Sequence, residues 1–219
     1  MLGALVGLTA EAKILRDVFP AMPVAVSGAT EAGARKGVAA LRRNGATALL
    51  SFGCAAGLKP ELGPGAILVP EWVESGGRRH EADPGLRRRF GAGRPGVVGG
   101  GMVHSPVIVA TAAEKAALAL RSGGAAVDME SGVVAESGLP FGVLRVVCDD
   151  AARDLPPVAR DVLAGGRISP WRLMAGLARA PGQIGGLIAL GRDAARARRE
   201  IARFLRSVEM DSNRDIAGG

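Results

Sequence analysis

Aromatic side chains are almost absent: the 219 residues include no Tyr, two Trp and five Phe. Proteins that bind single-stranded nucleic acid stack the bases on such side chains, and no helix-turn-helix, zinc-finger or ribonucleoprotein motif is present. The formal net charge of +7 therefore does not indicate a nucleic-acid partner, and we expect none.

Cysteine and histidine are equally scarce, with two residues of each. Cys54 and Cys148 lie far apart in the sequence, so the chain shows neither a disulfide framework nor a spacing suited to zinc. We therefore expect no metal site, and a cytoplasmic protein, because unpaired thiols suit a reducing compartment.

No apolar run reaches the roughly 18 residues that a membrane span needs, and the first residues lack the basic region of a signal peptide. What the chain does have is 48% apolar residues and 33 Gly, which is typical of a globular protein. Its length predicts one α/β domain. We place this domain at residues 1–208 and a flexible tail at 209–219.

Carboxylates stand at the ends of two predicted strands in the segment 126–149. A short apolar run ends at Asp128 and Glu130, a brief helix follows, and the run 141–147 predicts a strand that is buried on both faces and ends at Asp149 and Asp150. Open α/β sheets place their chemistry at the carboxyl ends of such strands. The sequence therefore predicts an acidic site there.

Two further segments have the composition of a binding site. A strand at 2–8 runs through Gly7 into a helix whose first turn contains Glu11. Residues 53–58, G-C-A-A-G-L, predict a turn after a strand at 46–52, and small residues allow backbone N–H groups to approach an anion or a sugar.

These motifs, in this order, resemble the purine nucleoside phosphorylase and nucleosidase superfamily. The resemblance is carried by S-F-G-C-A-A-G-L, A-V-D-M-E and L-P-F-G-V-L-R-V-V-C-D. It implies a three-layer α/β/α fold around a central mixed, mostly parallel sheet, and a homo-oligomer, with a dimer favoured. It also implies cleavage of a purine–ribose bond without a cofactor, with phosphate as the possible co-substrate.

The chemistry of that bond explains why two acids are needed. Breaking it leaves a cationic sugar and an anionic base, so a carboxylic acid must protonate the base and a carboxylate must stabilise the sugar. The resemblance assigns the first role to Asp149, whose pKa desolvation can raise. It assigns ribose binding to Glu130, kept ionised, and to Met129.

Other positions enter the candidate site through the same resemblance. The segment 105–109 falls where the superfamily places its base-facing loop. The remaining substrate contacts are then Gly53, Cys54, Ala55, Val107, Ile108 and Phe141. The candidate phosphate contacts are Gly7, Ser27, Gly28 and Lys13.

The nucleophile stays open. Superfamily phosphorylases bind phosphate through arginines that this sequence lacks at the matching positions. Hydrolytic nucleosidases instead hold water with a glutamate at the start of the first helix. Glu11 is either that water ligand or simply a favourable charge in the first turn of a helix.

The C-terminal part narrows the resemblance. The layout from L-P-P-V-A at 155–159 through A-R-A-P-G-Q-I-G-G-L at 178–187 resembles the hopanoid-associated phosphorylase branch. The implied substrate is adenosylhopane, cleaved to adenine and a ribosyl or ribosyl-phosphate hopane. The alternatives are a hydrolytic nucleosidase of the methylthioadenosine and adenosylhomocysteine type, and a non-catalytic basic scaffold at a membrane surface.

A basic helix is predicted over residues 182–208. Its arginines at 192, 196, 199, 203 and 206 are spaced by four and three residues, so they share one face. This face is either ordinary solvated surface or a contact with anionic lipid headgroups. The second reading predicts a protein that is peripheral at the inner face of the membrane.

Overall fold

The computed structural model describes residues 1–156 and 184–217. The elements of this part are, in chain order, β1 (Leu2–Val6), α1 (Thr9–Val18), β2 (Val24–Val26), α2 (Glu31–Arg43), β3 (Ala48–Gly57), β4 (Ile67–Leu68), β5 (Trp72–Ser75), β6 (Arg78–Glu81), α3 (Pro84–Arg89), β7 (Val97–Val98), β8 (Gly101–His104), α4 (Ala112–Ser122), β9 (Ala126–Asp128), α5 (Ser131–Ala135), β10 (Phe141–Asp149) and α8 (Ile184–Ala217).

These strands form one mixed sheet. Its main path is β6-β5-β8-β9-β3-β10-β4-β7, and β1 joins β3 and carries β2. The pairs β1–β2, β1–β3, β3–β10, β4–β7, β5–β8 and β8–β9 are parallel. The pairs β4–β10, β3–β9 and β5–β6 are antiparallel. The predicted mixed, mostly parallel sheet is therefore confirmed.

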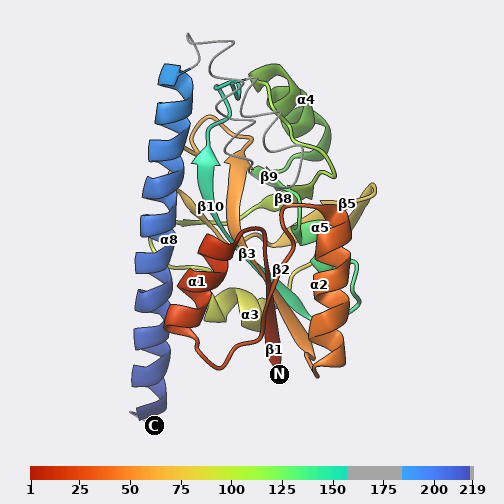
Figure 1. The fold of residues 1–219 in the computed structure, drawn as a ribbon, viewed down its shortest axis with the longest axis vertical. Helices are drawn as coiled ribbons and strands as arrows, with labels where there is room; N and C mark the ends of the chain where they lie inside the picture. Colours follow the sequence, from red (N-terminus) through yellow and green to blue (C-terminus); the bar gives the residue numbers. More distant parts are fainter. Residues whose placement is uncertain (157–183, 218–219) are drawn as a thin grey trace.

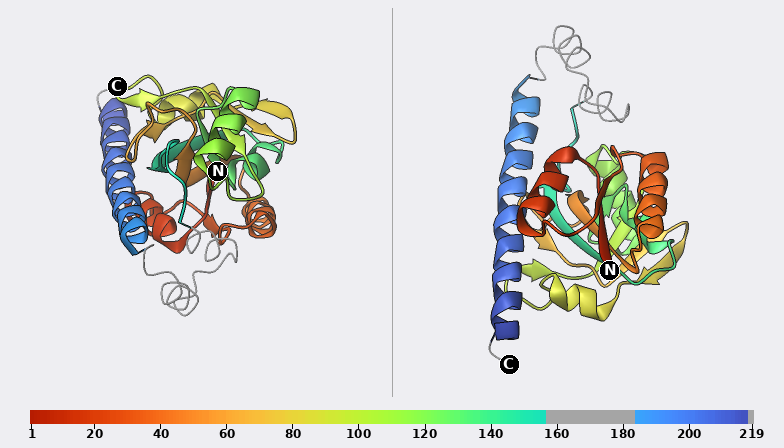
Figure 2. Two further views of the ribbon diagram at one scale, coloured as in Figure 1. Left: turned by 90° about the horizontal axis from the view of Figure 1, so that it is seen from above. Right: turned by 60° about the horizontal axis from the view of Figure 1, so that its bottom comes forward.

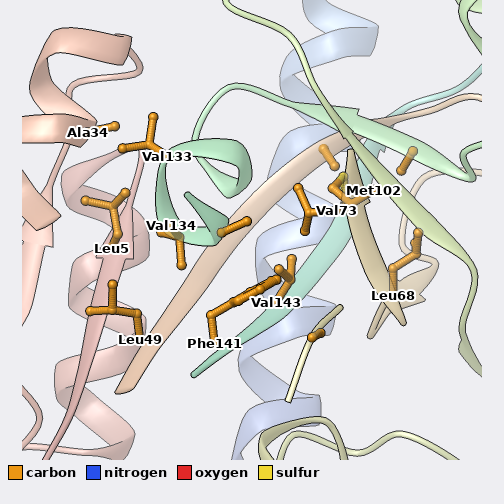
Figure 3. Close-up of a cluster of buried hydrophobic side chains, with 14 of the residues drawn as sticks. Leu5, Ala34, Leu49, Leu68, Val73, Met102, Val133, Val134, Phe141 and Val143 are labelled. Atoms are coloured by element: carbon orange, nitrogen blue, oxygen red, sulfur yellow. The ribbon is translucent and has the colours of Figure 1, made fainter. Parts of the chain in front are cut away.

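Helices cover both faces of this sheet (Figures 1 and 2). On one face, α2 and α5 pack with residues of β1, β3 and β10, through side chains such as Ala34 and Val134. Figure 3 shows this cluster between the helices and the strands. On the other face, α1 and α8 pack through Leu15, Ile201 and Leu205. The three-layer arrangement is thus as predicted.

Local sequence explains where several helices begin and end. The Thr30 hydroxyl accepts the backbone N–H of Gly33 at the start of α2, and Thr111 does the same for Glu114 at the start of α4. At the start of α3, the Asp83 carboxylate accepts the N–H of Leu86. Each cap satisfies a backbone donor that has no partner within its helix.

Two predicted boundaries are wrong. The segment 53–57 is not a turn after the third strand, because β3 continues through it to Gly57 and stays paired with β10 as far as Ala56. The predicted end of the last helix at residue 208 is also wrong, since α8 extends to Ala217. An ion pair of 2.7 Å between Arg94 and Asp211 holds this last part of α8 against the domain.

The predicted first residues of that helix, 182 and 183, lie outside the described residues, as does most of the segment that carries the C-terminal resemblance. Among the residues that are described, no helix is long and apolar enough to cross a membrane.

Candidate active site

A cavity of about 330 Å³ lies where β3 and β10 end and α1 begins. It is lined by Gly7, Leu8, Glu11, Ala29, Cys54, Ala55, Ala56, Val107, Ile108, Val109, Val127, Asp128, Met129, Glu130, Cys148, Asp149, Leu155, Leu190, Ala194 and Arg198. Distant parts of the sequence therefore meet at one site. Nine of these positions are catalytic, substrate or phosphate candidates of the sequence analysis: Gly7, Glu11, Cys54, Ala55, Val107, Ile108, Met129, Glu130 and Asp149.

Glu11 is held at the floor of this cavity by backbone donors. Its Oε2 accepts the N–H of Leu8 at 2.9 Å, and its Oε1 accepts the N–H of Cys54 at 2.9 Å. The side chain is buried, at 3% exposure. Two amide donors from β3 and from the start of α1 thus fix the carboxylate beside Glu130, with Gly7 between them.

The Glu130 carboxylate accepts a hydrogen bond from a hydroxyl group and lies close to a cationic side chain. The Ser27 hydroxyl donates to its Oε1 at 3.1 Å, and the Arg145 guanidinium lies 3.5 Å from its Oε2. Burial raises the pKa of Glu130 to about 7, with Arg145 acting against the rise and Asp128 and Glu11 adding to it. Glu130 is therefore only partly ionised near neutral pH, whereas the sequence analysis expects an ionised group.

Arg145 is a site residue that the sequence analysis missed. It lies on β10 with 1% exposure, 2.5 Å from Asp128 and 2.7 Å from the Ser51 hydroxyl. Its charge balances part of the negative charge of Glu130, Asp128 and Glu11. Burial lowers the pKa of Arg145, but these carboxylates raise it by more, so that the pKa is raised overall. The available signal was a single arginine inside an otherwise apolar strand, because a charge is buried only when it is paired.

Asp149 lies at the end of β10 with one carboxylate oxygen engaged and one free. Its Oδ2 accepts from the Lys115 ammonium at 2.5 Å, whereas its Oδ1 is buried without a hydrogen-bond partner among the described residues. Burial raises the pKa of Asp149, and the hydrogen bond and charge of Lys115 oppose that rise. A buried acceptor without a partner inside a cavity is suited to a ligand.

Lys115 was missed as well. It lies on α4 and is fully buried, on the same helix face as the buried Leu118 and Ser122. The signal in the sequence was the position of Lys115, three residues before Leu118 and seven before Ser122, which places it on the buried face of the helix. Lysine is almost never fully buried unless it is paired.

Two predicted site residues lie elsewhere. Phe141 is at the opposite end of β10, paired in register with Leu49 and packed in the core between the sheet and α5 (Figure 3). Lys13 points to solvent and pairs with Asp17 at 2.9 Å, with 76% of its side chain exposed. Phe141 as a substrate contact and Lys13 as a phosphate contact are therefore wrong.

The other candidates sit at the edge of the site. Ser27 does not line the cavity but supports Glu130, and its hydroxyl also accepts the N–H of Ala29. Gly28 and Ala29 both have positive φ values, 69° and 55°, which brings Ala29 to the cavity wall. Gly53 lies beneath Glu11 and Arg145, with no room for a side chain.

One wall of the cavity is apolar. Val107, Ile108 and Leu155 form it together with Leu190 and Ala194 of α8. Cys54 also lines the cavity, and its neighbour Cys148 together with burial raises the pKa of the Cys54 thiol. Such a thiol is a poor nucleophile. Within residues 1–156 and 184–217, no group of three or more His, Cys, Asp or Glu is placed to bind a metal ion.

Comparison with known proteins identifies the fold. No protein-family model matches the chain, and neither does any curated protein sequence. Among solved structures, the Helicobacter pylori 5′-methylthioadenosine/S-adenosylhomocysteine nucleosidase matches with a TM-score of 0.70 and 16% identity, over 96% of this chain and 97% of that one. The Streptococcus pyogenes S-adenosylhomocysteine nucleosidase gives 0.68 and 16%, over 94% of each chain.

Futalosine hydrolase of H. pylori is similar to the same degree, with a TM-score of 0.70 and 15% identity over 96% of this chain and 97% of that one. Matches over nearly the whole length of both chains show that the domain has the fold of nucleoside phosphorylases and nucleosidases. At these identities the likeness concerns the fold, so the activity has to be argued from the site.

Proposed function

We propose that the protein cleaves the N-glycosidic bond of an adenine nucleoside. One observation carries this proposal: Glu130 and Asp149 line the same cavity, and Asp149 has a buried oxygen without a hydrogen-bond partner among the described residues. Such a pair supplies a carboxylate for the sugar and an acid for the base. Proteins with the same fold are named for acting on methylthioadenosine, adenosylhomocysteine and futalosine.

The two carboxyl groups have separate roles in this reaction. As the C–N bond breaks, positive charge develops on the ribose, and Glu130 stabilises it while accepting hydrogen bonds from the ribose hydroxyls. The cationic sugar favours the ionised form of Glu130, which offsets its raised pKa. Asp149 gives a proton from Oδ1 to the leaving purine, and Met129 provides an apolar wall for the sugar.

Water is the nucleophile that the electrostatics favour. Glu11 already accepts the N–H groups of Leu8 and Cys54, which would otherwise be available to an anion. Glu11, Asp128 and Glu130 also line the cavity, and in their ionised forms they repel a phosphate dianion. In this proposal Glu11 accepts a hydrogen bond from the attacking water and takes its proton, so that the reaction is a hydrolysis.

The apolar wall indicates which group extends from the 5′ carbon of the sugar. Leu155, Leu190 and Ala194 offer a hydrocarbon surface, and burying such a surface stabilises an apolar ligand by about 25 cal/mol per Å². We therefore propose adenosylhopane, the substrate implied by the C-terminal sequence, ahead of methylthioadenosine, which the fold also suits.

A lipid-like substrate would be met at a bilayer, and α8 offers a surface for that contact. Arg192, Arg196, Arg199, Arg203 and Arg206 are all exposed. The same helix contributes Leu190 and Ala194 to the cavity wall. This arrangement supports the proposal that the arginine face of α8, defined by these five residues, binds anionic headgroups beside the cavity.

We also propose a homodimer, as the resemblance implies. Val107 is 67% exposed although it lines the cavity next to Ile108, and a second copy would cover this apolar side chain. Sedimentation of the purified protein tests this, and a monomer at all concentrations would contradict it.

The deciding experiment is to incubate the protein with adenosylhopane in detergent and, separately, with methylthioadenosine, each with and without phosphate. Free adenine and the sugar product are then measured. We expect adenine and a free reducing ribose, at a rate independent of phosphate. A ribose 1-phosphate product would assign phosphorolysis, and release of no adenine from either substrate would favour the non-catalytic scaffold.

A further inference from the structure

Lys115 is a buried cation in direct contact with the proposed acid. Its ammonium has three acceptors: Asp149 Oδ2 at 2.5 Å, the backbone oxygen of Asp150 at 2.7 Å and that of Arg153 at 2.8 Å. An ammonium group has three donors, so all of them are used. A buried ammonium group is stable in the protein interior only when all its donors are hydrogen-bonded, as they are in Lys115.

These bonds determine which Asp149 oxygen is already engaged by the protein. With Oδ2 fixed by Lys115, Oδ1 is the only carboxylate oxygen left for a ligand, and it has no partner among the described residues. The two backbone bonds of Lys115 also hold the segment after β10. That segment leads to Leu155 of the cavity wall, whose N–H donates to Ala110 beside α4.

The ammonium also opposes the effect of burial on the acid. Desolvation favours the neutral carboxylic acid, and a cation at hydrogen-bond distance favours the carboxylate. Other charged or titratable groups around Asp149 are Asp150 and Arg153 on its own segment, Asp193 and Arg198 on α8, Glu11 and Glu130 across the cavity, and the thiols Cys54 and Cys148. Of these side chains, Lys115 is the one that donates to the carboxylate of Asp149.

We infer that Lys115 is a positioning residue for base protonation: it aims Oδ1 of Asp149 at the purine and restricts the pH range over which this acid holds its proton. This inference rests on the proposed function, because it assigns to Lys115 a role in the same step. Lys115 acts only through Asp149 and touches no reacting atom. The proton passes from Asp149 Oδ1 to the purine nitrogen, and Lys115 keeps its own protons throughout.

A direct titration tests the electrostatic part without any catalysis. The carboxyl carbon of Asp149 is followed by ¹³C NMR in protein labelled at Asp, and its signal is assigned by its loss in Asp149→Asn. In Lys115→Gln the pKa of Asp149 should move upward, because the opposing charge is gone. In Lys115→Arg, which keeps the charge, it should stay closer to that of the parent protein. An unchanged Asp149 pKa in Lys115→Gln would overturn the inference.

A double-mutant cycle tests whether Lys115 acts through Asp149. Lys115→Gln should lower kcat about tenfold or more, with a smaller change in KM. In the Asp149→Asn background the same substitution should lower kcat by less than about twofold, because coupled residues are not additive. Equal losses in both backgrounds would assign Lys115 a merely structural role. Lys36→Met, an exposed lysine on α2, is the control and should change neither readout.

The outcomes separate this inference from the proposed function. If the parent protein cleaves no nucleoside, the proposed function fails, while the NMR titration still decides whether Lys115 tunes Asp149. If the protein is active but the cycle is additive, the inference alone fails. Failure of both Lys115→Gln and Lys115→Met to fold would show that the residue is needed for the fold, and would also overturn the inference.

Discussion

A Cβ atom at Gly53 would lie 2.5 Å from Oε1 of Glu11. Any side chain at position 53 would therefore displace the Glu11 carboxylate. The same Cβ would lie 2.7 Å from Nη1 of Arg145, and the φ of Gly53, +150°, is one that other residues rarely adopt. Because residue 53 has no side chain, Glu11 and Arg145 can both lie close to the β3 backbone beneath the cavity.

We expect Gly53→Ala to lower nucleoside cleavage by about 10²-fold or more, because a displaced Glu11 no longer holds the attacking water. Gly63→Ala is the matched control, since nothing lies within 4 Å of a Cβ there. Cleavage rates and the midpoint of urea unfolding are measured for both variants. Full activity in Gly53→Ala would show that the position of Glu11 does not matter for the reaction.

Asp149→Asn should bind the nucleoside yet release adenine about 10²-fold more slowly, or slower still, because an amide cannot give up a proton to the purine. Single-turnover kinetics with calorimetric binding separate the two effects. The control is Asp150→Asn at the next position, whose side chain does not line the cavity. Near-normal turnover in Asp149→Asn would remove Asp149 as the acid.

Glu130→Gln should lose several kcal/mol of transition-state stabilisation, on the order of what an electrostatic partner of a developing charge supplies. The loss should appear in kcat, because the positive charge on the ribose exists only in the transition state. Steady-state kinetics check this, with Glu61→Gln on the surface as the control. A change confined to KM would make Glu130 a binding contact only.

The raised pKa of Glu130 also predicts how stability depends on pH. Because the folded-state pKa is about 7, above the usual value for glutamate, the protein loses stability as the pH rises through about 7. The loss from this group is roughly 3–4 kcal/mol at most. Burial of Asp149 acts in the same direction.

Urea unfolding at pH 5 and pH 8 measures this effect. We expect Glu130→Gln to be more stable than the parent protein at pH 8 and to depend less on pH between the two values. Glu61→Gln should follow the parent protein at both. If Glu130→Gln and the parent protein lose the same stability between pH 5 and 8, Glu130 does not titrate in this range.

The arginine face of α8 should bind anionic vesicles in a salt-sensitive way, with each arginine near the surface contributing about 1 kcal/mol before screening. Replacing Arg192, Arg199 and Arg206 by Gln should weaken flotation with phosphatidylglycerol vesicles and leave cleavage of a water-soluble adenosine analogue unchanged. The control replaces the exposed Arg35, Lys36 and Arg43 of α2, which lies on the opposite side of the domain (Figure 1). Absence of vesicle binding at low salt would leave the arginine face as ordinary surface.

Local patterns in the sequence located strands, helix starts and the carboxylates of the acidic site, whereas the three-layer arrangement and the role of each carboxylate came from the family resemblance. Apolar runs ending in carboxylates located β9 and β10. Their ends meet because β9 runs antiparallel along the last residues of β3, with Val127 opposite Ala56, and Asp149 of β10 pairs with the same Ala56. Capping residues such as Thr30 and Thr111 located helix starts, because their hydrogen bonds span only three residues. Glu130, Asp149 and Glu11 were found in this way.

Tertiary structure alone decided the partners of these residues. The sequence marks Arg145 and Lys115 as unusual buried charges, but only the tertiary structure shows that Asp128 and Asp149 are their partners. Conversely, Phe141 and Lys13 stand in plausible motifs but are directed into the core and into solvent. Local sequence specifies backbone conformation and the buried face of each element, whereas the stability of a buried charge depends on groups that only folding brings within a few ångströms.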